Sequence, residues 1–378
     1  MRLLMVASNY PPAVGGIQRY ARELAGQLAL RSELVVVTPH AEGDRDYDAR
    51  QPLDVRRVRA IGDDLALSGI APLARLLHAQ RFDAAFATHW APGFALRRTA
   101  ALLGQRLPVF VAAHGKELIH RPLARIPLAQ PIYDRIRSSV LRSAAGFFPV
   151  STRTAELLRE QGTPYDRITI VNNGVDAEEF APRAAEALRR ELAPEGPLLM
   201  TVARLVPRKG IDSVLRALQV LLSRFPTLTY AIVGDGPDRA RLSALSDSLG
   251  VSARVRFSSR VGHDLVDYYN ACDLFVMPAR EETGDIEGFG LVFLEAGACE
   301  KPVIGARAGG VVDAIIDGVT GLLVAPDDIT ALAHAIDSCL SDPASARAMG
   351  HAARERILRE CSWAQAADRI AQAIAARI

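Results

Sequence analysis

Two glutamates, Glu287 and Glu295, stand eight residues apart in the stretch Glu-Gly-Phe-Gly-Leu-Val-Phe-Leu-Glu. Eight residues is a poor spacing for one helix face, but it suits a loop carboxylate followed by a helix that carries the second carboxylate in its first turns. Gly288 and Gly290 leave backbone N–H groups uncovered where that helix would begin, and a helix N-terminus favours an anion. The stretch therefore predicts a site that binds a polyol through its carboxylates and a phosphate through its backbone N–H groups.

A second stretch, Ala-Arg-Leu-Val-Pro-Arg-Lys-Gly at 203–210, joins an apolar run to a helix-spaced segment. Arg204 and Lys209 place two cations near a helix start, which is electrostatically unfavourable unless an anion binds there. A diphosphate fits, because arginine offers fork-shaped contacts and lysine a point charge. The alternative is that both residues are solvated surface charges.

A glycine pair, Gly15 and Gly16, separates an apolar run at 3–7 from a helix-spaced segment at 17–30. The pair thus lies in a strand-to-helix turn. Its backbone N–H groups could cradle a phosphate or a sugar. A tight turn that needs a positive φ would explain the same glycines.

His114 follows the apolar run 109–113 and precedes a glycine, so its ring can point into a crevice at the end of a strand. His89 is placed in the same way after 84–87. A histidine at such a position is either structural or functional, and we favour His114 as the functional one.

Short apolar runs alternate with helix-spaced segments along the chain, the run at 168–171 among them, which predicts parallel, doubly wound sheets. Ligands of such sheets lie beyond the carboxyl ends of the strands, where the glycine pair and both histidines would stand. A polar stretch at 175–195, rich in Ala, Glu and Pro, is the expected linker. We predict an α/β chain of two Rossmann-like domains, 1–175 and 176–360, whose parallel sheets face an interdomain cleft.

Length and charge agree with two domains, since 378 residues exceed the usual ceiling for one core. Residues 1–175 hold 23 Lys/Arg and 15 Asp/Glu, whereas the rest hold 22 and 28. A basic half beside an acidic half indicates different partners, or ordinary variation of the surface.

The cysteines lack C-x-x-C spacing, and we expect reduced thiols of a cytoplasmic protein; they are Cys272, Cys299, Cys339 and Cys361. The apolar run at 3–7 is too short for a signal peptide, and no run approaches the roughly 18 apolar residues that span a bilayer. Any membrane contact is therefore expected to be peripheral, on the inner face of the cytoplasmic membrane. No His, Cys, Asp or Glu cluster has metal-ligand spacing, so no metal is expected.

Residues 118–142 form the most basic interval, in which Asp134 is the single acid. Its five arginines alternate with leucines and isoleucines; they are Arg121, Arg125, Arg135, Arg137 and Arg142. Such a segment could dock on anionic lipid headgroups. A solvated helix face is the alternative.

The stretch at 287–295 resembles the E-x7-E motif of retaining glycosyltransferases of family 4, which have the GT-B fold. The resemblance extends over nearly the whole chain, through P-P-A-V-G-G-I-Q-R-Y, A-A-H-G-K-E, V-N-N-G-V-D, A-R-L-V-P-R-K-G and A-G-G-V-V-D-A-I-I-D-G-V-T-G-L-L-V. The G-G-I-Q and R-L-V-P-R-K-G stretches look closest to the bacterial phosphatidylinositol-mannoside mannosyltransferase branch.

The resemblance implies a role for each matching position. Glu287 would bind the hydroxyls of the donor sugar and Glu295 those of the ribose, while Arg204 and Lys209 would neutralise the donor diphosphate. His114 would contact the sugar near the reaction centre. The other expected donor contacts are Gly15, Gly16, Gly288, Phe289, Gly290, Leu291 and Val292 near the phosphates, with Arg260 and Val261 at the nucleobase. A C-terminal helix, 361–378, would cross back onto the first domain.

The implied reaction moves a hexose, mannose being favoured, from a nucleoside-diphosphate sugar with retention and without a metal or other cofactor. The acceptor would be lipid-linked or a glycan, and no nucleic-acid partner is expected. GDP-mannose leads among the donors; UDP-glucose, UDP-galactose and UDP-N-acetylglucosamine stay open.

Two other classes of function remain. One is a nucleotide-sugar-binding protein without turnover, which acts in assembly or regulation. The other is a dinucleotide-dependent oxidoreductase, but Gly-Asp-Gly-Pro at 234–237 is not the G-x-G-x-x-G that such an enzyme would carry.

Overall fold

The computed structural model describes residues 1–59, 65–124, 126, 129–259 and 265–378. It divides into two compact units, Met1–Asn173 with Trp363–Ile378, and Gly174–Ser362. The first unit ends two residues before the boundary expected at 175, and the chain enters it again at Trp363. Each unit is built around its own parallel sheet.

The first unit has a six-stranded parallel sheet in the order β3-β2-β1-β4-β5-β6. Its strands are β1 (Arg2–Val6), β2 (Glu33–Pro39), β3 (Asp54–Val58), β4 (Ala84–Ala87), β5 (Val109–Ala113) and β6 (Gly146–Pro149). β4 and β5 are buried apolar runs, as is typical of strands covered on both faces. The strand order reverses between β1 and β4, and such a reversal marks the crevice in which doubly wound sheets bind ligands.

Helices connect these strands, as the alternating pattern predicts. They are α1 (Gly16–Ala29), α2 (Asp44–Asp48), α3 (Leu65–Ser68), α4 (Ile70–Ala79), α5 (Trp90–Leu102), α6 (Lys116–Ile119), α7 (Ala129–Leu141) and α8 (Thr152–Glu160), with a 3₁₀ turn η1 (Tyr165–Arg167). α1 buries Tyr20, Leu24 and Leu28, which recur at helical spacing on one face.

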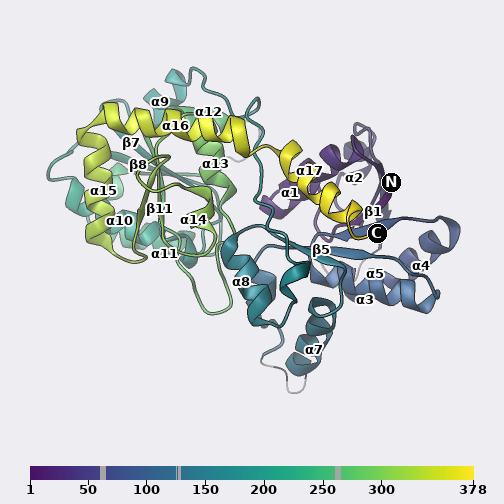
Figure 1. Cartoon of the computed structure of the whole chain (residues 1–378). Helices are drawn as coiled ribbons and strands as arrows, with labels where there is room; N and C mark the ends of the chain where they lie inside the picture. Colours follow the sequence, from purple (N-terminus) through teal and green to yellow (C-terminus); the bar gives the residue numbers. More distant parts are fainter. Residues whose placement is uncertain (60–64, 125, 127–128, 260–264) are drawn as a thin grey trace. The chain divides into compact units, whose positions relative to one another are not determined.

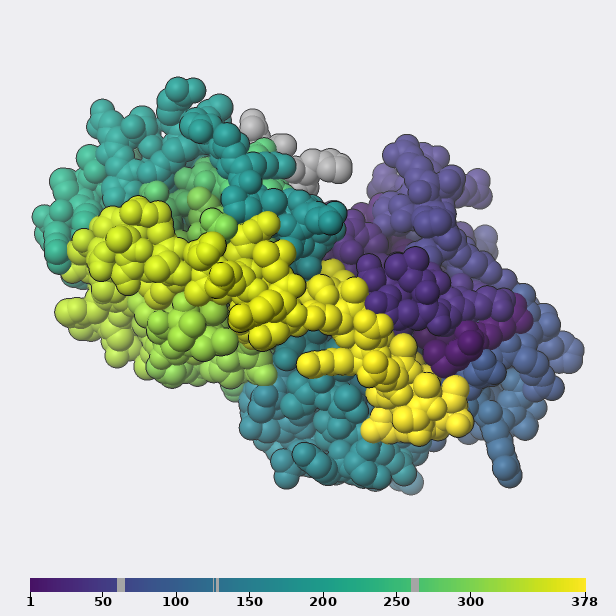
Figure 2. Space-filling model, turned by 45° about the horizontal axis from the view of Figure 1, so that its top comes forward, coloured from purple at the N-terminus to yellow at the C-terminus, as the bar shows by residue number. Residues whose placement is uncertain are grey.

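The last helix, α17 (Trp363–Ala375), belongs to the first unit and packs along α1. Figure 1 shows α17 in yellow beside α1 in purple, and the same two colours lie against each other in Figure 2. Its buried face includes Trp363, Ala367 and Ile370. The end of the chain therefore completes the core of the unit that its beginning forms.

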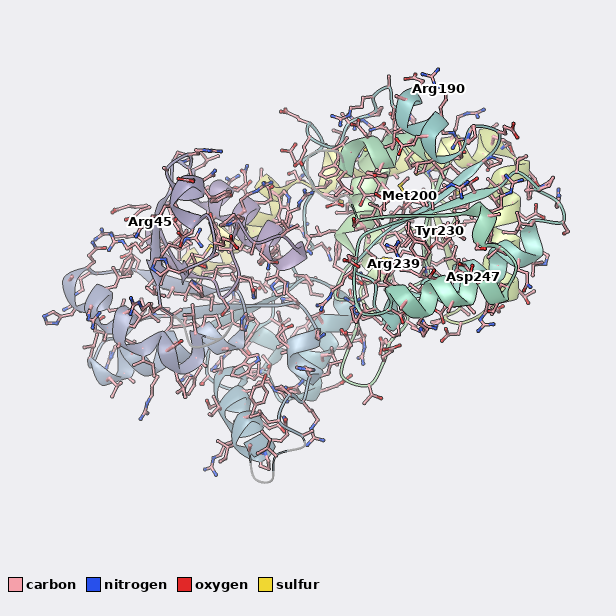
Figure 3. The ribbon with its side chains drawn as sticks, turned by 180° about the vertical axis from the view of Figure 1, so that it is seen from behind. Arg45, Arg190, Met200, Tyr230, Arg239 and Asp247 are labelled. Atoms are coloured by element: carbon pink, nitrogen blue, oxygen red, sulfur yellow. The ribbon has the colours of Figure 1, made fainter. Side chains whose placement is uncertain are left out.

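The second unit repeats the same topology. Its strands are β7 (Leu198–Val202), β8 (Thr229–Val233), β9 (Val255–Ser258), β10 (Leu274–Met277), β11 (Val303–Ala306) and β12 (Leu322–Val324), all parallel and in the order β12-β11-β10-β7-β8-β9. β7 and β10 are neighbours at the reversal of strand order, as β1 and β4 are in the first unit. Figure 3 shows Met200 and Tyr230 inside this unit, on the adjacent strands β7 and β8.

Helices cover both faces of this sheet. Leu274 and Val276 of β10 join a buried cluster with α10 and α15, whereas the intervening Phe275 packs against Phe293 of α13. This alternation is the period of two of a strand. The helices are α9 (Glu186–Leu192), α10 (Ile211–Leu221), α11 (Arg239–Ser248), α12 (Leu265–Ala271), α13 (Leu291–Ala298), α14 (Val311–Ala314), α15 (Ile329–Ser341) and α16 (Pro343–Glu360), with 3₁₀ turns η2 (Pro207–Lys209) and η3 (Ser252–Arg254). In Figure 3, Arg239 and Asp247 mark the two ends of α11.

The prediction of a strand at 168–171 is wrong. This segment forms a single parallel bridge, between Ile168 and Phe147, although its N–H groups at Thr169 and Val171 donate to Phe147 and Pro149 of β6. Pro149 has no N–H to donate in return, so the ladder cannot continue.

The expected linker at 175–195 is also corrected, because this stretch packs within the second unit. Phe180 is buried, and α9 lies against α12. The Val175 N–H donates to the Cys361 carbonyl at 2.8 Å. Because the stretch is otherwise polar, its composition did not indicate that Phe180 would be buried.

In the described parts of the chain, no helix is long and apolar enough to cross a membrane.

Candidate active site

Two loops of the second unit carry the stretches that the sequence singles out. One joins β7 to α10 and holds Arg204 and Lys209; the other joins β10 to α13 and holds Glu287. Both loops follow the carboxyl ends of the neighbouring strands at the reversal of strand order. The fold thus brings together residues almost 80 positions apart, at the place where such sheets bind ligands.

Gly210 fixes how closely the two loops approach. It has φ +69°, and a Cβ atom there would lie 2.1 Å from the Pro278 carbonyl oxygen at the end of β10. The loops are also joined by a hydrogen bond of 2.8 Å from the Arg280 N–H to the Arg208 carbonyl. Only glycine allows both this backbone conformation and this contact.

We expect Gly210→Ala to destabilise the second unit by more than about 2 kcal/mol, because a left-handed alanine costs about 1–2 kcal/mol before any clash is counted. Gly250→Ala is the matched control, since Gly250 has φ +70° with no atom within 4 Å of its Cβ position. Urea unfolding followed by hydrogen exchange of β7 and β10 measures both variants. Equal losses would contradict a specific role for the approach to Pro278.

Lys209 and Glu287 form an ion pair between the two loops. Lys209 Nζ donates to Glu287 Oε2 at 2.5 Å, and the two side chains are only 10% and 11% exposed. Arg208 Nη1 contacts the same Oε2, and Arg208 Nε lies 3.1 Å from Asp285 Oδ1. Two cations of one loop therefore pair with two carboxylates of the other loop.

This cluster keeps Glu287 ionised. Burial alone would raise the pKa of its carboxyl, but the charges of Lys209 and Arg208 outweigh burial and lower the pKa to about 2. A permanent carboxylate is an acceptor of hydrogen bonds only, which suits a group that holds sugar hydroxyls. It does not suit a general acid, and the hydroxyl-binding role of Glu287 stays a prediction.

The backbone around Glu287 is also fixed. Its carbonyl accepts from the Gly310 N–H at 2.8 Å. Gly290, with φ +91°, precedes the first residue of α13, and no side chain caps this helix. The first N–H groups of a helix have no acceptor within it, so the start of α13 is suited to an anion. Of the residues expected here, Gly288, Leu291 and Val292 are partly exposed, while Phe289 is buried.

Glu295 lies in the second turn of α13, as the spacing predicts. Its side chain is buried, and its Oε2 accepts from the Tyr269 hydroxyl at 2.6 Å. The two glutamates thus have different surroundings: Glu287 pairs with cations, whereas Glu295 accepts a hydrogen bond from a hydroxyl of α12.

Arg204 is exposed. Arg260 and Val261 lie outside the described residues.

In the first unit, Gly15 and Gly16 are exposed at the start of α1. His114 follows β5, as expected. Its Nε2 lies 2.9 Å from the Thr88 carbonyl, and its backbone N–H donates to Glu117 at 2.6 Å. Burial lowers the pKa of its ring, so His114 is neutral near pH 7. A carbonyl can only accept, so Nε2 carries the proton and Nδ1 is left as an acceptor for a hydroxyl.

His89 has a structural position at the start of α5. Its Nδ1 accepts from the Ala91 N–H at 3.3 Å, which caps the helix. Burial, and after it the charge of His114, lowers the pKa of His89 to about 3.

We therefore expect His89 to stay neutral between about pH 5 and 8. The pKa is lower in the folded chain than in the unfolded chain, so its contribution to stability is complete above pH 6.5 and is lost as the pH falls towards 3. The measurement is an NMR titration of labelled histidine, with His89 assigned by its absence in His89→Asn. In urea the same signal should titrate near 6.5. Titration near pH 6 in the folded chain would contradict the buried, helix-capping position.

Four residues touch the expected site residues but were not predicted as site residues; they are Arg208, Asp285, Thr88 and Tyr20. Arg208 had a signal, because it is the middle cation of the 204–209 stretch. Asp285 had a weaker one, two residues before Glu287. The backbone carbonyl of Thr88 gives no signal in a sequence.

The family profile described as "Glycosyl transferase 4-like domain" matches residues 15–174, and that described as "Glycosyl transferases group 1" matches residues 183–356. The chain is 32% identical to the GDP-mannose-dependent alpha-(1-6)-phosphatidylinositol monomannoside mannosyltransferase of Mycolicibacterium smegmatis, over 99% of this chain and 98% of that protein. This chain belongs to the group 1 glycosyltransferases.

Other relatives of this glycosyltransferase carry the names of different enzymes. It is 29% identical to the glycogen synthase of Mycobacterium tuberculosis, over 98% of this chain and 94% of the synthase. Among solved structures, HepE of Anabaena in complex with UDP-glucose matches with a TM-score of 0.82 at 20% identity, over all of both chains. Sucrose-phosphate synthase of Thermosynechococcus elongatus matches with a TM-score of 0.80 at 23% identity, over 98% of this chain and 97% of that one. These likenesses confirm the predicted GT-B fold.

Within the residues that the structure describes, this glycosyltransferase has no group of three or more His, Cys, Asp or Glu side chains that could hold a metal ion.

Proposed function

We propose that this glycosyltransferase moves a hexose, mannose being favoured, from a nucleoside-diphosphate sugar to a lipid-linked or glycan acceptor, with retention at the anomeric carbon. The observation that carries the proposal is the Lys209–Glu287 pair, which sets a buried cation of the β7–α10 loop beside a permanent carboxylate of the loop that leads to the start of α13. The first suits a diphosphate and the second suits a polyol. The preference for GDP-mannose rests on the relative from M. smegmatis.

In the proposed reaction, the bond between the anomeric carbon and the diphosphate oxygen breaks, and a bond to the acceptor oxygen forms on the same face. The leaving phosphate takes the acceptor proton. Negative charge therefore grows on the diphosphate, where Lys209, Arg204 and the first N–H groups of α13 would stabilise it. Glu287 would hold the sugar hydroxyls, Glu295 the ribose, and His114 the transferred sugar. No metal or other cofactor takes part in this scheme.

A thermal-shift screen with GDP, UDP and their sugars tests the donor. A ligand at 100 times its dissociation constant stabilises the folded state by about 2.7 kcal/mol, which is readily seen. We expect GDP-mannose to give the largest shift. A larger shift with UDP-glucose would overturn the choice of donor, and a shift with NAD alone would favour an oxidoreductase.

Nucleotide release separates an enzyme from a protein that only binds nucleotide sugars. The stabilising donor is incubated with a lipid extract or a glycan, and the product is examined by NMR for the anomeric configuration. Inversion would contradict the mechanism, and a loss of rate with EDTA would contradict metal independence. Binding without any release of nucleotide would favour a regulatory or assembly role.

The basic segment at 118–142 is proposed to contact an anionic membrane, and the structure narrows the set of residues that can do so. Arg137 is buried, at 8% exposure, and bonds to Asp134 at 2.8 Å, so it does not belong to a lipid-facing surface. Arg121, Arg135 and Arg142 are exposed, as are Ile126 and Ile132. Arg125 lies outside the described residues. The proposed contact therefore rests on three exposed arginines with two exposed isoleucines.

We expect anionic vesicles to retain the protein at low salt and to release it at high salt. Each arginine near an anionic surface contributes about 1 kcal/mol, so Arg121→Glu with Arg135→Glu should weaken retention by tenfold or more. Arg98→Glu with Arg159→Glu is the matched control, because both residues are exposed elsewhere in the first unit. Equal retention on neutral vesicles would refute the membrane contact.

A further inference from the structure

Three aromatic rings from distant parts of the chain lie in a row in the first unit. The ring of Trp363, the first residue of α17, stands 5.8 Å from the ring of Tyr20 at an interplanar angle of 74°. Tyr20, in α1, stands 4.6 Å from the ring of His114 at 88°. Tyr20 and Trp363 are each only 4% exposed. Edge-to-face pairs at these distances are favourable and directional.

Tyr20, the middle ring of this row, packs against the imidazole of His114. In the described part of the chain, the imidazole ring is otherwise held only at its Nε2 atom. The hydrogen bond from His114 Nε2 to the Thr88 carbonyl selects the tautomer, and the bond from its backbone N–H to Glu117 orders the turn. Neither bond fixes the plane of the ring. The perpendicular contact with Tyr20 does so, and it thereby sets the direction of the Nδ1 lone pair.

Tyr20 in turn depends on α17. A second contact, remote from the rings, holds this helix on α1: Arg31, just after the end of α1, donates to the Ala364 carbonyl at 3.2 Å and pairs with Asp368 at 2.5 Å. The two attachments offer a comparison, because the Arg31 contact can be weakened without touching the rings.

We propose that Trp363 is a positioning residue for His114, acting through Tyr20, so that the last helix of the chain sets the orientation of the imidazole. This proposal rests on the proposed function, in which His114 contacts the transferred sugar. It assigns α17 a part in the reaction beyond closing the core, although none of its residues touches His114 in the contacts described above. The buried row also excludes water from one side of the imidazole, in keeping with its lowered pKa.

An ordinary role in the core is the competing explanation, and it makes a different prediction. A residue that only stabilises the unit would lower the fraction folded without changing His114 in the molecules that remain folded. A positioning residue changes the imidazole itself. The readout must therefore report on the ring, not only on activity.

The experiment uses the full chain with labelled histidine in Trp363→Ala, Trp363→Phe and Asp368→Asn. We expect the wild-type His114 nitrogens to show a single Nε2–H tautomer. In Trp363→Ala the ring can turn and the bond from Nε2 to Thr88 weakens, so the signals should shift towards averaged values and the pKa should rise. With GDP-mannose as donor, kcat should fall about tenfold to a hundredfold with a smaller change in KM, the usual size of an effect of misplacement. Trp363→Phe should retain most of the activity, and Asp368→Asn should resemble the wild type.

Unchanged His114 signals in folded Trp363→Ala would overturn the proposal, as would an equal change in Asp368→Asn. If Trp363→Ala does not fold, Tyr20→Leu removes the middle ring but leaves an apolar side chain at that position, and the same signals decide. Absence of turnover in the wild type with every nucleotide sugar would remove the proposed function. The tautomer measurement would still decide whether the rings position His114.

Discussion

Replacing Lys209 with alanine is expected to lower kcat by about 10²–10³, or roughly 3–4 kcal/mol of transition-state stabilisation. The reason is that Lys209 is a buried cation whose charge cannot be replaced by water when the diphosphate departs. Its ammonium group has three donors, of which Glu287 takes one. The other two can therefore serve the leaving group. Steady-state kinetics with the donor from the thermal-shift screen measure the loss.

Lys301→Ala is the matched control, since Lys301 lies in the same unit and donates to the Asn270 carbonyl at 2.8 Å, remote from Glu287 in its contacts. This variant should keep kcat near the wild-type value. Circular dichroism establishes that both variants fold. Near-normal turnover of folded Lys209→Ala would remove Lys209 from the reaction.

Much of the fold could be predicted because each strand leaves a local signal. The apolar runs 84–87 and 109–113 coincide with strands, since buried parallel strands need no polar alternation. The run at 168–171 does not form a strand because of one residue of its partner strand, Pro149. No local pattern of the run itself can reveal this partner. Phe180 was missed as an anchor because a single buried aromatic leaves no periodicity.

The site was predicted in its parts but not in its pairing. The sequence predicts a loop carboxylate at Glu287 and a cation at Lys209, each from its own neighbours. That they share a hydrogen bond depends on the adjacency of β7 and β10, which is a property of the topology. The pairing of Arg208 was missed for the same reason, although its position between Arg204 and Lys209 is a signal in the sequence. Only the folded loops show that its guanidinium turns towards Asp285 and Glu287 and not towards solvent.

Replacing Arg208 with leucine is expected to weaken the second unit by about 3 kcal/mol and to lower kcat/KM by about tenfold to a hundredfold. Removing one member of a buried ionic cluster leaves the others uncompensated, here Asp285 and, in part, Glu287. The stability loss is placed at the lower end of the usual 3–5 kcal/mol because the side chains of Arg208 and Asp285 are 17% and 23% exposed. Hydrogen exchange of β7 and β10 measures the stability of this unit alone.

The double variant Arg208→Leu with Asp285→Asn decides whether the stability loss comes from the cluster. If it does, removing the charge of Asp285 as well should recover part of the lost stability, because a buried carboxylate is no longer left without its cation. Catalysis should not recover, since Glu287 still lacks the contact that orients it. Arg208→Lys should keep the charge but not the fork that reaches both carboxylates, so its kcat/KM should lie between those of the wild type and Arg208→Leu. Additive stability losses in the double variant would show that Arg208 and Asp285 act independently, and would contradict an origin of the loss in this pair.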